Sequence, residues 1–186
     1  MIGGLEIGAN AVNALSIFLA ARNSVHTWWV GVIGSALFGV LFFLSRLYAD
    51  TLLQVLFIAT SAVGWWQWRS GGSNGGKLPV TRIALPRMFV VIAVATLVAA
   101  GYGCLLWRFT DAFAPFIDSL ILTLSIAAQI LLMYRKYESW WFWLVVNVLS
   151  IALFSVRELW VTAGLYTVFW INAVVALVRW RRLVTS

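Results

Sequence analysis

Seven apolar runs, each long enough to cross a bilayer, dominate this sequence and restrict what it can fold into. Their approximate limits are residues 5–21, 28–47, 51–68, 85–107, 113–134, 140–156 and 159–178. A membrane-spanning helix needs about 20 mainly apolar residues. With 63% apolar and only 10% charged residues, the chain cannot cover a water-facing surface of ordinary polarity. We therefore predict an all-α integral membrane protein with seven transmembrane helices, whose solvent is the lipid bilayer.

The basic residues predict how these helices are oriented. If the loops alternate between the two sides of the membrane, ten of the thirteen Lys and Arg residues fall on one side and three on the other. The richer side includes Arg135, Lys136 and a glycine-rich linker over about 70–83. Because Lys and Arg are enriched in cytoplasmic loops, we expect the linker and the carboxyl terminus in the cytoplasm and the amino terminus outside. Charges at the ends of apolar runs indicate orientation, so we expect no nucleic-acid partner.

The two halves of the chain resemble one another. Leu15-Ser16-Ile17 recurs as Leu124-Ser125-Ile126, and Trp28-Trp29 recurs as Trp140-Trp141, about 110 residues later. An odd helix between two three-helix segments would keep both segments in the same orientation. Chance similarity between apolar segments is the alternative. We predict one membrane domain built as 3+1+3 parallel repeats, an arrangement that can place a transport site between its halves. The expected parts are repeat one at about 5–69, a linking helix at about 85–107 and repeat two at about 113–180.

The sixth apolar run carries a polar and aromatic stripe. Trp140, Trp143 and Asn147 are spaced i, i+3 and i+7, so they share one face of a helix. An Asn side chain in hydrocarbon must satisfy its donor and acceptor, so it should face the bundle or a cavity. Indole faces beside it could stack on a planar ligand. A simple hydrogen bond between helices is the alternative.

Similar stripes occur in three other runs, and each could be either bundle packing or part of one shared polar cavity. Their members are Gln54, Phe57 and Ser61 in the third run, Ser125 and Gln129 in the fifth, and Thr162, Tyr166 and Phe169 in the seventh. The residues show no sign of an enzyme. His26 is the one histidine, and no spacing suggests a catalytic dyad, a metal site or a phosphate-binding loop. We expect no cofactor and no metal.

The sixth-run motif resembles the signature of a known family. Trp140-x-x-Trp143-x-x-x-Asn147, preceded by Arg135-Lys136, is similar to the pattern of the PnuC family of bacterial vitamin transporters. The segments 47–55, 64–68 and 124–129 resemble family segments and follow in family order. The resemblance covers nearly the whole chain.

The resemblance implies a function that the residues alone do not. It implies facilitated uptake of nicotinamide riboside across a bacterial cytoplasmic (inner) membrane, by a homotrimer whose product a cytoplasmic kinase traps by phosphorylation. Trp faces suit the cationic pyridinium, and Asn or Gln suits the carboxamide and hydroxyls. Thiamine or another vitamin remains an alternative substrate. A non-transporting membrane scaffold is the alternative of another class.

One position departs from the family pattern. Family members commonly have an Asn within the segment 30–35, where this chain offers Gly34. A lost amide could reshape the site, so the vitamin stays open between nicotinamide riboside and its alternatives. The mechanism we expect is alternating access, with two three-helix bundles rocking about a midplane site. The expected substrate-binding residues are Trp140, Trp143, Asn147, Gln54, Gln129, Tyr166, Phe57 and Ser61.

Overall fold

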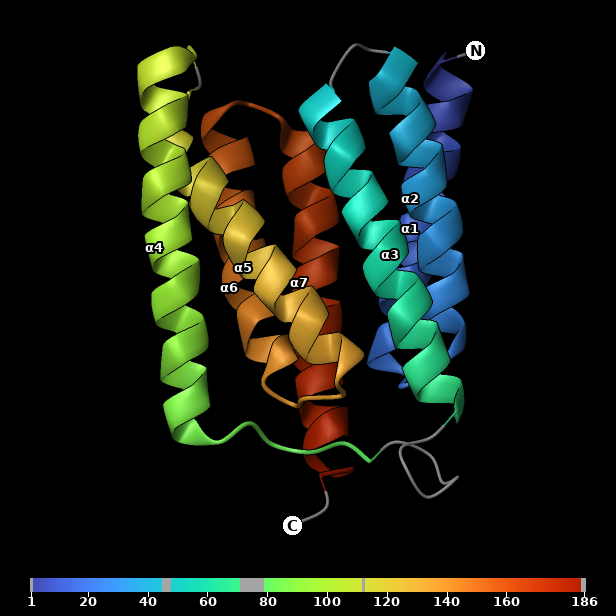
Figure 1. Cartoon of the computed structure of the whole chain (residues 1–186). Helices are drawn as coiled ribbons and strands as arrows, with labels where there is room; N and C mark the ends of the chain where they lie inside the picture. Colours follow the sequence, from blue (N-terminus) through green and yellow to red (C-terminus); the bar gives the residue numbers. More distant parts are fainter. Residues whose placement is uncertain (1, 45–47, 71–78, 112, 185–186) are drawn as a thin grey trace. The chain divides into compact units, whose positions relative to one another are not determined.

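The structure is a computed structural model, and it describes residues 2–44, 48–70, 79–111 and 113–184. These residues form helices and contain no β-strand. The helices are α1 (Ile2–Ala21), α2 (His26–Leu44), α3 (Tyr48–Ser70), α4 (Leu85–Phe109), α5 (Pro115–Met133), α6 (Ser139–Val156) and α7 (Trp160–Arg181) (Figure 1). Each predicted run lies within three residues of the helix it predicted at either end. The all-α fold is thus confirmed. Residues 71–78 of the predicted linker lie outside the described residues.

Within the described residues, five helices are long and apolar enough to cross a membrane. They are α2, α4, α5, α6 and the segment Thr162–Arg181 of α7. The apolar part of α1, Ile7–Ala21, is shorter. Helix α3 falls outside this set because it also carries polar side chains such as Gln54, Gln67 and Arg69.

The exposed surface of these helices is apolar, which is the reverse of a water-soluble bundle. Helix α4 shows this most clearly, because only 17% of its apolar window is buried. Its exposed side chains include Phe89, Leu97 and Trp107, and Leu97 is 72% exposed. In water such a surface would aggregate, but in a bilayer it meets lipid tails of the same polarity.

Contacts within the chain define two compact units, residues 1–79 and residues 80–186. In the first unit, α2 packs against both α1 and α3 (Figure 1). Gly64 of α3 permits part of this packing, since a Cβ there would lie 2.6 Å from Cε3 of Trp28. Trp28 is 2% exposed, and its ring meets Trp68 edge-on with centroids 5.3 Å apart.

In the second unit, α5 packs against α4 and α6, and α6 packs against α7. Gly103 of α4 lets α4 and α5 approach, because a Cβ there would lie 2.6 Å from the Phe116 ring. Leu124, Ala128 and Val146 belong to the buried apolar cluster that joins α5 to α6. The order of contacts in α5–α6–α7 therefore matches that in α1–α2–α3.

The turn after α1 and the turn after α5 share one backbone geometry. Asn23 and Arg135, 112 residues apart, both adopt the left-handed conformation, with φ of 56° and 49°. The amide of Asn23 donates to the Ala20 carbonyl at 2.9 Å, and the amide of Arg135 donates to the Leu132 carbonyl at 2.9 Å. The next amide in each turn donates back to the carbonyl five residues earlier. This pair of bonds is the Schellman motif that ends many helices.

An extended segment over 80–83 fastens the start of α4 to the turn between α5 and α6. The Thr81 amide donates to the Arg135 carbonyl at 3.2 Å, and the Tyr137 amide donates to the Thr81 carbonyl at 3.0 Å. The Ile83 amide donates to a carboxylate oxygen of Glu138 at 2.9 Å. Lys136 Nζ donates to Thr81 Oγ1 at 2.8 Å. These bonds satisfy backbone groups that the helices leave unpaired.

Candidate functional site

Helix α6 carries the central residues of the predicted stripe. Trp143 is half-buried and packs on the apolar cluster between α5 and α6. Asn147, one turn further along, is only 4% exposed, and its amide bonds to no described residue. An unpaired amide in a buried position costs about 1–3 kcal/mol. A hydrogen-bonding solute or water reaching this position would remove that cost, which makes Asn147 the strongest site residue in the second unit.

Trp140, at the start of the same helix, has different surroundings. Its side chain is 2% exposed, and its ring meets Trp180 of α7 edge-on with centroids 5.5 Å apart. Its indole nitrogen has no hydrogen-bond partner in the described part of the chain. The Trp140 ring therefore packs between helices, whereas Trp143 keeps part of its surface free.

Tyr166 of α7 lies in a group of three aromatic rings. Its ring centroid is 5.2 Å from Phe154 of α6 and 5.7 Å from Phe169 of α7. Phe154 was not among the predicted residues, although it lies seven residues after Asn147 and so continues the same face of α6. Extending the stripe by two more turns would have found it. Gln129 of α5 is half-buried and, like Asn147, bonds to no described residue.

In the first unit the predicted residues lie on α3. Gln54 is 9% exposed and Ser61 is 3% exposed, whereas Phe57 is half-buried. Gly31 of α2 lies beside this face, since a Cβ there would be 3.4 Å from Ser61 Oγ. The same Cβ would be 3.2 Å from the Ser16 hydroxyl of α1. Small and polar groups of three helices therefore meet around Gly31.

The Ser16 hydroxyl already has partners that hold α1 to α2. Ser16 Oγ donates to the Thr27 carbonyl at 2.8 Å, and Thr27 Oγ1 donates to the Ser16 carbonyl at 2.8 Å. This reciprocal pair is buried. It stabilises the helix pair, and of the two hydroxyls beside Gly31 only that of Ser61 takes no part in it.

The 112-residue offset of the turns also relates the two sets of candidate residues. Trp28 and Trp140 differ by 112, as do their partners Trp68 and Trp180. The same offset pairs Gln54 with Tyr166, Phe57 with Phe169, Ser61 with Ala173 and Gly31 with Trp143. The first unit thus has an amide, a hydroxyl and a glycine where the second has phenol, methyl and indole. The two sets differ in chemistry at equivalent positions.

The offset also clarifies the departure at Gly34. The residue that corresponds to Asn147 is Ser35, and Gly34 corresponds to Val146. Gly34 is buried against α1, where a Cβ would lie 3.5 Å from the Asn13 amide nitrogen. Ser35 is half-buried. By this correspondence the first unit keeps a short hydroxyl at the Asn147 position.

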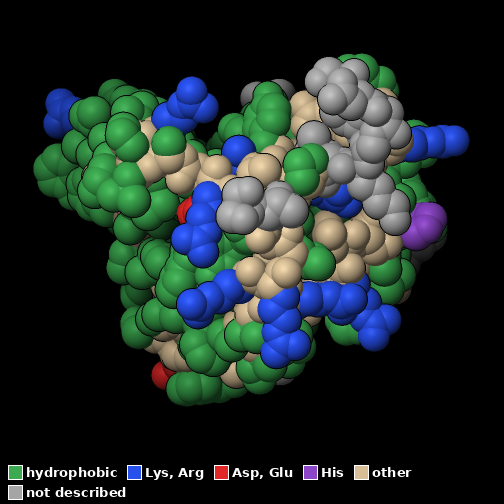
Figure 2. Space-filling model, turned by 90° about the horizontal axis from the view of Figure 1, so that it is seen from below, with side chains coloured by type: hydrophobic (Ala, Val, Ile, Leu, Met, Phe, Trp, Pro, Cys, Tyr) green, Lys and Arg blue, Asp and Glu red, His purple; other side chains and the backbone are tan. Residues whose placement is uncertain are grey.

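Charge is concentrated near the turn between α5 and α6. Arg135 is 5% exposed, and its burial lowers the pKa of the guanidinium. Seen from the end at which α4 begins, basic side chains are prominent and acidic ones few (Figure 2). In the described part of the chain, no group of three or more His, Cys, Asp or Glu side chains could hold a metal ion.

Comparison with known proteins defines the class. A family model described as "Nicotinamide mononucleotide transporter" matches residues 3–182. The nicotinamide riboside transporter PnuC of Escherichia coli (strain K12) is 28% identical over 178 residues, which cover 82% of this chain and 74% of that protein. The riboflavin/roseoflavin transporter RibM of Streptomyces davaonensis is 25% identical over 152 residues, covering 80% of this chain and 70% of RibM.

A solved structure shows the same fold. The crystal structure of the vitamin B3 transporter PnuC matches with a TM-score of 0.71 and 21% sequence identity, covering 98% of this chain and 87% of that one. Fold, apolar surface and relatives together define a multi-pass membrane transporter, which confirms that the chain is not an enzyme. The chain belongs to the nicotinamide mononucleotide transporter family, as its resemblance to PnuC proteins predicted.

Proposed function

We propose that this protein carries nicotinamide riboside across the bacterial inner membrane by facilitated diffusion. The observation that supports this most is Asn147, a buried amide without a bonding partner among the described residues, one turn from the half-buried ring of Trp143. An indole face attracts the cationic pyridinium, and an amide can bond to the carboxamide or to the ribose hydroxyls. The names of several relatives point to the same solute.

The candidate residues favour the riboside over the mononucleotide. A phosphate group is bound best by Arg, Lys or a cluster of backbone amides. The proposed substrate-binding residues are all uncharged: Trp140, Trp143, Asn147, Gln54, Gln129, Tyr166, Phe57 and Ser61. A dianionic phosphate in this environment would have no compensating charge. We therefore propose that the nucleoside is carried and that the nucleotide is excluded.

We propose that α1–α3 and α5–α7 are parallel repeats joined by α4, and that transport uses alternating movements of these repeats. The shared Schellman turns and the matching Trp pairs, all 112 residues apart, support the repeat. We propose further that the carboxyl terminus is cytoplasmic, that the protein is a homotrimer, and that a cytoplasmic kinase traps the product. The riboflavin transporter among the relatives favours one second candidate, a larger vitamin such as riboflavin.

Uptake by protein reconstituted in liposomes tests the function. Labelled nicotinamide riboside should enter without ATP and stop when the inside and outside concentrations are equal, because facilitated diffusion stores no energy. Nicotinamide mononucleotide, thiamine and riboflavin should be compared at the same concentration, with protein-free liposomes as the control. Preferential flux of riboflavin would establish the second candidate, and no flux of any of the four would refute transport of these vitamins.

A further inference from the structure

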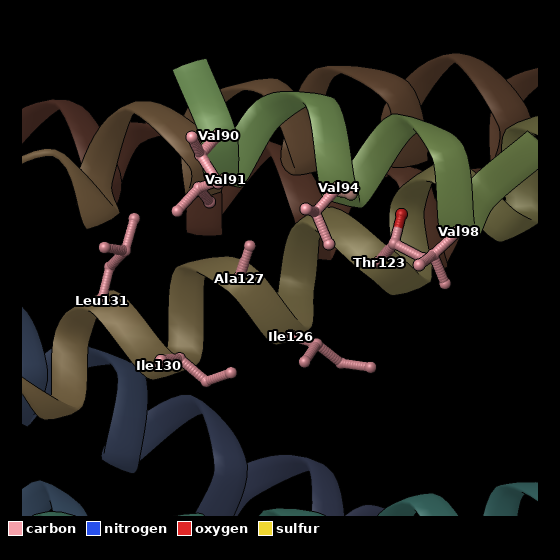
Figure 3. A pocket seen from close by; sticks show the side chains of 10 residues that line it. Val90, Val91, Val94, Val98, Thr123, Ile126, Ala127, Ile130 and Leu131 are labelled. Carbon is pink, nitrogen blue, oxygen red and sulfur yellow. The ribbon is translucent and has the colours of Figure 1, made fainter. Parts of the chain in front are cut away.

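An apolar groove lies between α4 and α5 and has no role in the proposed transport (Figure 3). Its volume is about 330 Å³. Its lining consists of Val90, Val91, Val94, Ala95, Val98, Thr123, Ile126, Ala127, Ile130 and Leu131. Thr123 is the polar member, and its hydroxyl donates to the carbonyl oxygen of Ser119 in its own helix at 3.0 Å. The groove therefore suits a hydrocarbon ligand.

The groove is open along α4 and reaches only part of the way across a membrane. Val90, Val94 and Val98 are 60%, 54% and 53% exposed. In Figure 3, Val94 and Val98 extend from α4 toward α5, and Ala127 extends from α5 toward α4. From Val90 to Val98 the groove runs about 12 Å along the helix, at 1.5 Å per residue. This is less than half of the roughly 30 Å hydrocarbon core, so the groove lies in one leaflet.

Basic side chains lie at the end of the groove where α4 begins. Arg87 is three residues before Val90 and four before Val91, so it lies one helical turn away on the same side of α4. Arg87 is exposed and has no partner among the described residues. This end of the groove thus combines an apolar channel with an available guanidinium.

Two further cations and one carboxylate lie near this end. Ile83 packs on the same apolar cluster as Leu131, which places its exposed neighbour Arg82 at this end of the unit. Lys136 Nζ donates to Thr81 Oγ1 at 2.8 Å. Glu138 is the carboxylate, and it accepts a hydrogen bond from the Ile83 amide. Three basic side chains against one engaged carboxylate leave a net positive charge.

We propose that this groove binds an anionic glycerophospholipid, with an acyl chain between α4 and α5 and the phosphate at Arg87, aided by Arg82 and Lys136. Basic pockets between transmembrane helices on the cytoplasmic side are suited to anionic headgroups. A second copy of this chain fits less well. Copies inserted in the same direction would bring identical basic ends together, whereas an anionic lipid neutralises them.

Lipid retention measured by native mass spectrometry tests this site. The purified chain is incubated in detergent with phosphatidylglycerol or with phosphatidylcholine, and bound lipid is counted. The unmodified chain should retain phosphatidylglycerol preferentially. Arg87→Gln should lower that retention about fivefold, since one basic residue near the surface contributes about that factor. Arg108→Gln is the matched control, because Arg108 is exposed at the other end of the same helix.

A second pair of variants tests the apolar part. Val94→Trp should fill the groove and lower phosphatidylglycerol retention, whereas Leu97→Trp should not, because Leu97 does not line the groove. Both positions are more than half exposed, so the added ring meets lipid or detergent and the fold tolerates it. Equal retention of the two lipids, equal losses in Arg87→Gln and Arg108→Gln, or unchanged retention in Val94→Trp would each overturn the proposal. A changed oligomeric mass in Val94→Trp with unchanged lipid would assign the groove to a second copy.

Discussion

At the scale of single residues, Asn147 and Trp140 show how burial separates members of one sequence stripe. Both lie on one face of α6, and both are less than 5% exposed. Trp140 has a ring partner in Trp180, so its burial is explained by packing. The Asn147 amide has no such partner among the described residues. Its burial is therefore understandable if a solute uses the amide during transport.

Replacing Asn147 by Leu should separate binding from stability. We expect nicotinamide riboside to bind about tenfold more weakly, the equivalent of about 1.4 kcal/mol for one lost hydrogen bond. The melting temperature should be unchanged or higher, because the change removes an unpaired polar group from an apolar setting. Equilibrium binding and thermal unfolding in the same detergent measure the two effects.

Ser119→Ala is the control for this experiment. Ser119 is also fully buried, but its hydroxyl donates to the Pro115 carbonyl of its own helix at 2.6 Å. Its removal should leave binding unchanged. If Asn147→Leu kept full binding and lowered the melting temperature, Asn147 would be a structural residue and the proposed site would be wrong.

At the scale of helices, close approach depends on a few glycines. Gly64 has the tightest contacts in the first unit, since three Trp28 ring atoms would lie 2.6–2.7 Å from a Cβ added there. Trp28 cannot move aside easily because it is 2% exposed and packs on Trp68. In the second unit the residue 112 positions later is Ala176, which is fully buried. The α2–α3 contact thus has less space than its counterpart.

Gly64→Ala should therefore push α3 away from α2. We expect a loss of about 1–3 kcal/mol in the free energy of unfolding, which is typical of overpacking in a well-packed core. Gly101→Ala on α4 is the control, since a Cβ there meets nothing within 4 Å. That variant should be neutral or more stable by up to about 1 kcal/mol, because Ala favours helix. Equal stability of the two variants in denaturant titration would contradict the packing explanation.

At the scale of the whole molecule, the distribution of charge determines how the chain inserts. The richer set of basic residues includes the last-turn arginines of α7, Arg179 and Arg181. Lys and Arg near transmembrane ends are retained in the cytoplasm. The proposed lipid site depends on the same charges, because it uses the basic end of α4.

A reporter enzyme that is active only outside the cytoplasm tests this orientation. Fused after Val184, it should be inactive, and fused after Phe109, at the end of α4, it should be active. The two fusion points differ in side because α5, α6 and α7 lie between them. Activity of the first fusion together with silence of the second would reverse the proposed topology.

The sequence by itself determined the seven helices, their limits and the family. It could do so because apolar length and charge at helix ends are local properties of the chain, and because the motif around Trp143 and Asn147 is specific. The internal similarity was also visible there, although the Leu-Ser-Ile match is three residues out of register with the 112-residue offset of the turns.

Only the tertiary structure decided which polar and aromatic residues have partners. Helical periodicity gives the direction of a side chain but not what lies opposite it, so Trp140 and Trp143 were equivalent until Trp180 was seen against one of them. The bonds of residues 80–83 to the turn after α5 join segments 55 residues apart, and no local pattern announces them. The groove between α4 and α5 likewise exists only where two helices with small facing side chains meet.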